Sequence, residues 1–171
     1  MVKWSLISSD RGGLANAHEE AEYKERGISM LQRVIAHPGP LLNKTLTLPS
    51  PDGMPPHYTL SQKDGIVLCG KIDWLEYNAT DDTINIIDFK TGKNEESSDS
   101  LQLPIYYLLV TNLQRRKVAK ICYWYIERDD EPTNMTLPHL DEARKLILEL
   151  ALRIKDGGAV WNSRRTFLIA A

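Results

Sequence analysis

The sequence of 171 residues has few cysteines, no long apolar run and no excess of charge of one sign. Its two cysteines, Cys69 and Cys122, each lie inside an apolar stretch, which is typical of buried thiols in a reducing compartment and excludes a disulfide scaffold. No apolar run approaches the roughly 20 residues that a membrane helix needs. The first six residues are too few and too polar for a signal peptide. We therefore expect a cytoplasmic protein with no membrane partner.

The charge is nearly balanced, with 21 Lys and Arg against 23 Asp and Glu. A net charge of −2 gives no global signature of nucleic-acid binding, so any such contact has to come from local clusters. Basic residues gather at 115–117 with Lys120, and at 164–165. The first cluster follows an expected helix, where cations either interact with the helix dipole or contact phosphates. The sequence favours neither interpretation.

The composition is that of a globular protein, with 42% hydrophobic and 26% charged residues, and the length suits one domain. Hydrophobic periodicity predicts helices and strands in mixed order. The expected segments are an amphipathic helix over 17–36, a strand over 66–77, a strand over 83–90 that completes a hairpin, a helix from 99 or 100 to about 116, a strand over 118–126, an edge strand over 134–137 and a helix over 141–155. This order predicts an α/β fold with a mixed central sheet flanked by helices.

Two carboxylates and a lysine are expected to meet at one end of the predicted hairpin. Asp88 and Lys90 are two residues apart, so they project from the same face of their strand. Asp73, in the neighbouring strand, can approach Asp88 across an antiparallel pair. Carboxylates are oxygen ligands suited to Mg²⁺ or Mn²⁺, and a lysine can hold water and offset negative charge. These three groups fit phosphodiester hydrolysis. The simpler interpretation is a set of solvated charges at a strand end, but Asp88 directly follows an apolar run and needs a partner there.

Three short motifs occur in order along this part of the chain: Gly70-Lys71-Ile72-Asp73, then Asp88-Phe89-Lys90-Thr91-Gly92, then Gln102-Leu103-Pro104-Ile105-Tyr106. Each is weak alone. Together, on the expected strand, strand and helix, they resemble the RecB-like branch of the PD-(D/E)XK nuclease superfamily. The resemblance implies a restriction-endonuclease-like fold, with the whole of 1–171 forming one nuclease-like domain.

The resemblance also implies roles for individual residues. Asp73 and Asp88 would be metal ligands, with the backbone carbonyl of Phe89 as a third, and the metal would be Mg²⁺ or Mn²⁺. Asp73, Asp88 and Lys90 would be the catalytic residues. A further pair, four residues apart on one helix face, would position the nucleic-acid strand: Gln102 and Tyr106.

The sequence departs from the family pattern in two respects. Many members carry a histidine on an early helix that completes the metal site, and His18 is the candidate here, although its surroundings match poorly; the domain can therefore lack the family's histidine helix. Some RecB-like nucleases hold an iron–sulfur cluster with four cysteines, and two cysteines exclude that cluster unless ligands come from elsewhere.

The predicted function is that of a metal-dependent deoxyribonuclease, exonuclease-like on single-stranded ends. Its expected partners are DNA with a single-stranded end and a helicase or another DNA repair protein. Two alternatives stay open at this point. The first is a catalytically inactive nucleic-acid-binding or assembly module with the same fold, and the second is an unrelated α/β domain in which the charged pairs are structural.

Overall fold

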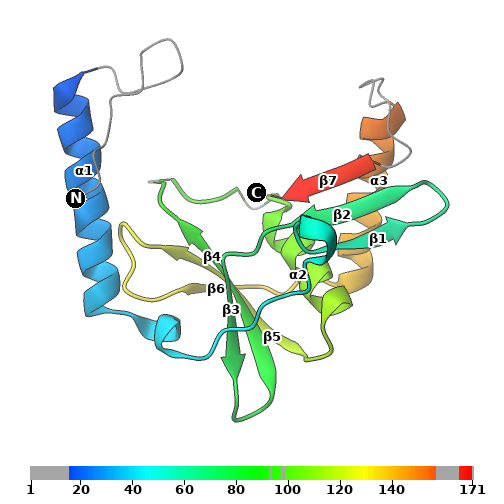
Figure 1. The fold of residues 1–171 in the computed structure, drawn as a ribbon, viewed down its shortest axis with the longest axis horizontal. Helices are drawn as coiled ribbons and strands as arrows, with labels where there is room; N and C mark the ends of the chain where they lie inside the picture. The colour runs from blue at the N-terminus through cyan, green and yellow to red at the C-terminus, as the bar shows by residue number, and fades with distance from the viewer. Residues whose placement is uncertain (1–15, 93, 98, 157–165, 171) are drawn as a thin grey trace.

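The computed structural model describes residues 16–92, 94–97, 99–156 and 166–170. Within these ranges the elements follow one another as α1 (Ala17–Ala36), η2 (Gly39–Leu42), η3 (Pro51–Gly53), β1 (His57–Ser61), β2 (Ile66–Gly70), β3 (Trp74–Asn78), β4 (Thr83–Lys90), α2 (Gln102–Leu113), β5 (Val118–Tyr125), β6 (Thr133–Met135), α3 (Leu140–Asp156) and β7 (Thr166–Ala170) (Figure 1).

The strands form two mixed sheets. The four-stranded sheet has the order β3-β4-β5-β6, with β4 and β5 parallel and both outer pairs antiparallel. The three-stranded sheet has the order β1-β2-β7, with β1 and β2 antiparallel and β2 and β7 parallel. Helices α2 and α3 pack beside them, and α1 stands at the other side of the molecule (Figure 1). The predicted α/β class, with a mixed sheet flanked by helices, is confirmed.

Helix α2 lies at the centre of the core. It connects the parallel strands β4 and β5, as such a pair requires, and it contacts both sheets and α3. Apolar residues occur on almost every side of this helix, and six of them are buried: Leu103, Ile105, Tyr106, Leu108, Leu109 and Val110. A helix that is apolar all round is stable only when it is enclosed. Its N-terminal end is thereby fixed against the end of β4.

The expected strand over 66–77 is wrong, because the chain breaks between Gly70 and Trp74. The first part is β2, all five residues of which are buried between β1 and β7, and the second part is β3 at the edge of the other sheet. Apolar periodicity does not reveal where a chain leaves one sheet for another. The hairpin itself is confirmed, since β3 and β4 pair antiparallel with Trp74 opposite Ile87.

The other segments agree with the prediction in kind and differ at their ends. The bounds of α1 are as predicted, and the Asn16 side chain caps it by accepting from two backbone amides. Helix α2 begins later than expected, at Gln102, with Leu101 at the N-cap position, and the predicted capping residue Ser100 accepts from the Gln102 amide at 3.4 Å. Strand β5 is buried between its neighbours, β6 is an exposed edge, and the strands β1 and β7 were not predicted. Both cysteines are buried thiols.

The amphipathic pattern of α1 does not correspond to a buried face. Met30 is the buried residue of this helix, whereas Ile28, Leu31 and Ile35 are exposed. The helix is attached by polar contacts: Arg26 pairs with Glu127 and donates to the carbonyl of Thr91, and Arg33 pairs with Asp130. No helix among the described residues is long and apolar enough to cross a membrane.

Because α2 carries the core, truncating one of its enclosed side chains should be costly. Leu109→Ala removes a fully buried side chain, and we expect a loss of about 2–5 kcal/mol in the free energy of unfolding. Leu146→Ala, at a half-exposed position of α3, should change it by less than about 0.5 kcal/mol. Urea denaturation followed by circular dichroism measures both. Equal losses would contradict the placement of the core.

Candidate active site

The candidate site lies where β4 ends against the first turn of α2. Asp88 and Lys90 project from the face of β4 that packs on α2, because Ile84 and Ile86 on the same face belong to the main core. Asp73 lies in the break between β2 and β3, directly before β3 and not within it as predicted. The side chains that the sequence singles out are therefore brought together at one end of the sheet.

Asp88 is the most constrained member of this group. It is a buried charged residue, 1% exposed, in a core that is otherwise almost entirely apolar. Its Oδ1 accepts a hydrogen bond of 2.9 Å from Nε2 of Gln102. Its Oδ2 lies 3.0 Å from Nζ of Lys90 as an ion pair, and no donor among the described residues is directed at it with hydrogen-bond geometry.

Burial raises the pKa of Asp88 to about 6, since desolvation penalises its charge by more than the neighbouring Lys90 offsets. The nearby Asp73 carboxylate raises this pKa further, so the two carboxylates are close enough to interact. Near neutral pH, Asp88 is thus a buried carboxylate that another positive charge would stabilise. A carboxylate in this state is suited to bind a cation.

Lys90 is held by a ring of acceptors. Its ammonium lies 3.0 Å from both Asp88 Oδ2 and Glu96 Oε1, and it donates to Oε1 of Gln102. The ring of Tyr123 lies 5.0 Å from the ammonium, within cation–π range. Burial lowers the pKa of Lys90, but its ion pairs with Asp88 and Glu96 outweigh that effect and the pKa is raised overall. Lys90 is therefore a cation at neutral pH.

Asp73 holds the backbone where the β3–β4 ladder stops. Ile87 is the last residue of β4 that pairs with β3, so the amide of Phe89 has no strand partner on the side of β3. Oδ2 of Asp73 accepts from this amide at 3.0 Å. In an extended strand the N–H and C=O of one residue point to the same side. The Phe89 carbonyl therefore lies on the edge that faces Asp73.

Gln102 connects the two charges. Its Oε1 accepts from Lys90, and its Nε2 donates to Asp88 and, at 3.2 Å, to the hydroxyl of Tyr106. Only one amide orientation satisfies an ammonium and a carboxylate together. Tyr106 is fully buried, and burial raises the pKa of its hydroxyl. The predicted contact of this pair with a nucleic-acid strand stays a prediction, because both side chains here face the charged residues of the protein.

Sequence reasoning missed three residues around Lys90. Tyr123 and Tyr125 lie on β5 opposite Asp88 and Lys90 in the parallel register, and alternation along the strand could have indicated them. The Tyr125 hydroxyl accepts from the backbone amide of Glu96 at 2.8 Å. Glu96 lies in an irregular loop, so no periodicity marks it.

The oxygen ligands available at this site are of the kind that binds a divalent cation. Asp73 and Asp88 offer carboxylate oxygens, the Phe89 carbonyl lies on the adjoining edge, and Asp88 Oδ2 is buried without a directed donor. These are the oxygen ligands that Mg²⁺ and Mn²⁺ prefer. In the described ranges no group of three His, Cys, Asp or Glu side chains could hold a metal. His18 does not join the group: its side chain is 83% exposed and lies beside Glu22 of its own helix.

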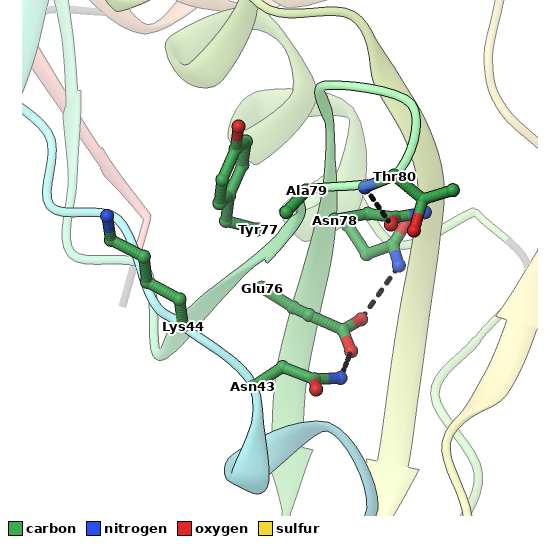
Figure 2. Close-up of a pocket in the computed structure, with 8 residues that line it drawn as sticks. Asn43, Lys44, Glu76, Tyr77, Asn78, Ala79 and Thr80 are labelled. Atoms are coloured by element: carbon green, nitrogen blue, oxygen red, sulfur yellow. Dashed lines mark hydrogen bonds between the residues drawn. The ribbon is translucent and has the colours of Figure 1, made fainter.

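A separate hollow of about 590 Å³ lies away from these residues, beside β3 (Figure 2). In it, the Glu76 carboxylate accepts from the side-chain amides of Asn43 and Asn85. It contains neither Asp88 nor Lys90. Of the basic cluster that follows α2, Arg116 pairs with Asp82, so this cation serves a structural contact. The second basic cluster, 164–165, lies outside the described residues.

A comparison with protein-family models gave a match. The family model described as the PD-(D/E)XK nuclease superfamily matches residues 11–164. The chain belongs to this superfamily. Members of the PD-(D/E)XK superfamily are generally nucleases, which act on nucleic acids and typically use divalent metals. A search of curated proteins and a search of solved structures gave no match.

The raised pKa of Asp88 predicts a pH-dependent stability. In the unfolded chain the pKa of an aspartate is about 3.9, and in the folded protein the pKa of Asp88 is about 6. The unfolded state therefore loses its proton first, and this residue's contribution to stability falls as pH rises from about 4 to about 6. Asp88→Asn should remove that fall, so that without metal the variant gains stability relative to the wild type across this window.

Urea denaturation at several pH values in EDTA measures the effect. Asp82→Asn is the control, because Asp82 contributes to stability with the opposite pH dependence. Hydrogen bonds from Arg116 and Tyr77 lower the pKa of Asp82, so its stabilising effect is lost as pH falls. An unchanged pH dependence in Asp88→Asn would contradict the assigned pKa.

Proposed function

We propose that this protein is a metal-dependent nuclease of the RecB-like branch that hydrolyses DNA phosphodiester bonds. The observation that carries the proposal is the buried Asp88–Lys90 pair, which Gln102 bridges at the edge where Asp73 also lies. A cluster of charged side chains buried in an apolar core costs stability, so it is more typical of a functional site than of a structural contact. The order of the three motifs supports the RecB-like branch.

Each side chain has a distinct proposed role. Asp73, Asp88 and the Phe89 carbonyl would hold Mg²⁺ or Mn²⁺, which when bound polarises a phosphate oxygen and acidifies water. Lys90 remains protonated because its pKa is raised, so it stabilises negative charge rather than removing a proton. It would orient the attacking water or the scissile phosphate through its ammonium protons. Gln102 keeps the ammonium and the Asp88 carboxylate in fixed relation.

The finer parts of the proposal concern the substrate. The RecB-like motifs support a DNA substrate with a single-stranded end, exonuclease-like cleavage and cooperation with a helicase or another repair protein. The two buried thiols support a location in the cytoplasm. Gln102 and Tyr106 lie at the N-terminal end of α2. A strand bound at the site would pass over this end, where the helix dipole favours phosphate.

One observation favours the alternative of an inactive nucleic-acid-binding module with the same fold. The carboxylates Asp73 and Asp88 form a pair, and the described residues contain no histidine or third carboxylate that joins them as a metal group. Such a module would bind nucleic acid without turnover.

A cleavage assay distinguishes the two functions. End-labelled single- and double-stranded DNA, with RNA for comparison, is incubated with Mg²⁺ or Mn²⁺, and EDTA is the metal-free control. We expect metal-dependent cleavage that Asp88→Asn reduces by at least about a hundredfold, since loss of one metal ligand removes the activated water. Asp141→Asn, on the exposed start of α3, should leave the rate unchanged. Binding without cleavage by folded wild-type protein would favour the inactive module.

Lys90→Ala distinguishes metal binding from catalysis of cleavage. We expect a loss of about 10²–10³ in cleavage rate, as for other charge-stabilising groups, with binding of Mn²⁺ retained because Asp73 and Asp88 remain. Isothermal titration calorimetry measures the metal, and Lys145→Ala on α3 is the matched control. Normal cleavage by Lys90→Ala would show that the lysine has another role.

A further inference from the structure

The ammonium of Lys90 is already surrounded by oxygen atoms of the protein. Three oxygen atoms surround it, from Asp88, Glu96 and Gln102, and an ammonium has three donors. A nucleic-acid phosphate can approach Lys90 only by replacing one of these acceptors. The three are held very differently, which decides which one can leave.

Two of the acceptors are fixed by the core. Asp88 is a buried residue of β4, and Gln102 contacts Asp88, Lys90 and Tyr106 at once. Glu96 belongs to the loop between β4 and α2, and its side chain is 33% exposed. It is thus the acceptor on the solvent side of the lysine.

The environment of the Glu96 carboxylate suits a phosphate equally well. It consists of the Lys90 ammonium and the Ser100 side chain, and hydrogen bonds from both lower the pKa of Glu96. A phosphodiester, like a carboxylate, carries one negative charge over two oxygens and is bound by the same donors. Lys90 already lies 3.0 Å from the Asp88 carboxylate, so a phosphate beside Glu96 would be a third anion at one ammonium, and the phosphate and Glu96 compete for the same place.

The backbone of the loop need not move for this exchange. The amide of Glu96 is held by the Tyr125 hydroxyl at 2.8 Å. The glutamate side chain can nevertheless rotate about its own bonds towards solvent. The loop therefore holds the carboxylate beside the lysine while leaving it free to swing away.

We propose that the Glu96 carboxylate occupies the binding position of a substrate phosphate beside Lys90 and is displaced when a nucleic-acid strand binds. Glu96 is then a positioning residue: it keeps the lysine in place without substrate and weakens substrate binding by competition. This inference rests on the proposed nuclease function, because it takes the substrate to be a phosphodiester.

The test compares Glu96→Gln with Glu95→Gln. Glutamine has the size of glutamate without its charge, and Glu95 is a suitable control because it is the neighbouring residue, 71% exposed, and pairs with Arg128 instead of Lys90. Both variants remove one negative charge from the same loop. A general change in net charge therefore affects them alike, and a local effect at Lys90 appears in Glu96→Gln alone.

KM and kcat are measured on a single-stranded oligonucleotide with Mn²⁺. We expect Glu96→Gln to lower KM roughly fivefold with kcat unchanged, and Glu95→Gln to change neither. Equal decreases of KM in both variants would overturn the proposal, as would an unchanged KM. A large loss of kcat in Glu96→Gln would also overturn it, because Glu96 would then be needed beside Lys90 in the reacting complex.

Binding of a fluorescent oligonucleotide in EDTA, measured by anisotropy, separates this proposal from the proposed function. Binding in EDTA with no cleavage once Mg²⁺ or Mn²⁺ is supplied would contradict the nuclease, whereas tighter binding by Glu96→Gln, lost again when Lys90→Ala is added, would still support the competition. Absence of binding by both the wild type and Glu96→Gln would overturn the Glu96 proposal itself.

Discussion

The structure of the candidate site depends on one buried carboxylate. Asp88 sits inside an apolar core, where its charge is unfavourable, and the groups around it compensate in part. Lys90 supplies the opposite charge and Gln102 supplies a hydrogen bond to Oδ1. The compensation is incomplete, because Oδ2 has no directed donor among the described residues. A metal ion at this position would relieve that deficit.

The fold keeps this arrangement rigid through α2. The helix is enclosed by both sheets and α3, so its first turn cannot shift without disturbing the core. Gln102 and Tyr106 are consequently fixed relative to the end of β4. On the other side of β4, Asp73 replaces the missing strand by accepting from the Phe89 amide. The packing of α2 in the core therefore keeps the charged side chains of the site within hydrogen-bond distance of one another.

Sequence analysis anticipated those parts of the structure that depend on local pattern. The bounds of α1, the β3–β4 hairpin and the buried β5 follow from periodicity and turn residues. The break after Gly70 was not predicted, because the alternation of charged and apolar residues over 71–74 is that of a strand, while the chain passes between two sheets there. The approach of Asp88 to Lys90 follows from their spacing in a strand. The position of Glu96 depends on a loop contact with Tyr125, for which the sequence carries no pattern.

The attachment of α1 has a consequence for the motions of the molecule. Ion pairs at a protein surface are each worth little, about 0–1 kcal/mol, and are screened by salt. Arg26 and Arg33 make such contacts, and Met30 adds one buried side chain. Backbone amides of α1 should therefore exchange with solvent by local opening well before those of α2, and faster as ionic strength rises. Because Arg26 also binds the Thr91 carbonyl, directly after Lys90, each opening releases the backbone next to the lysine.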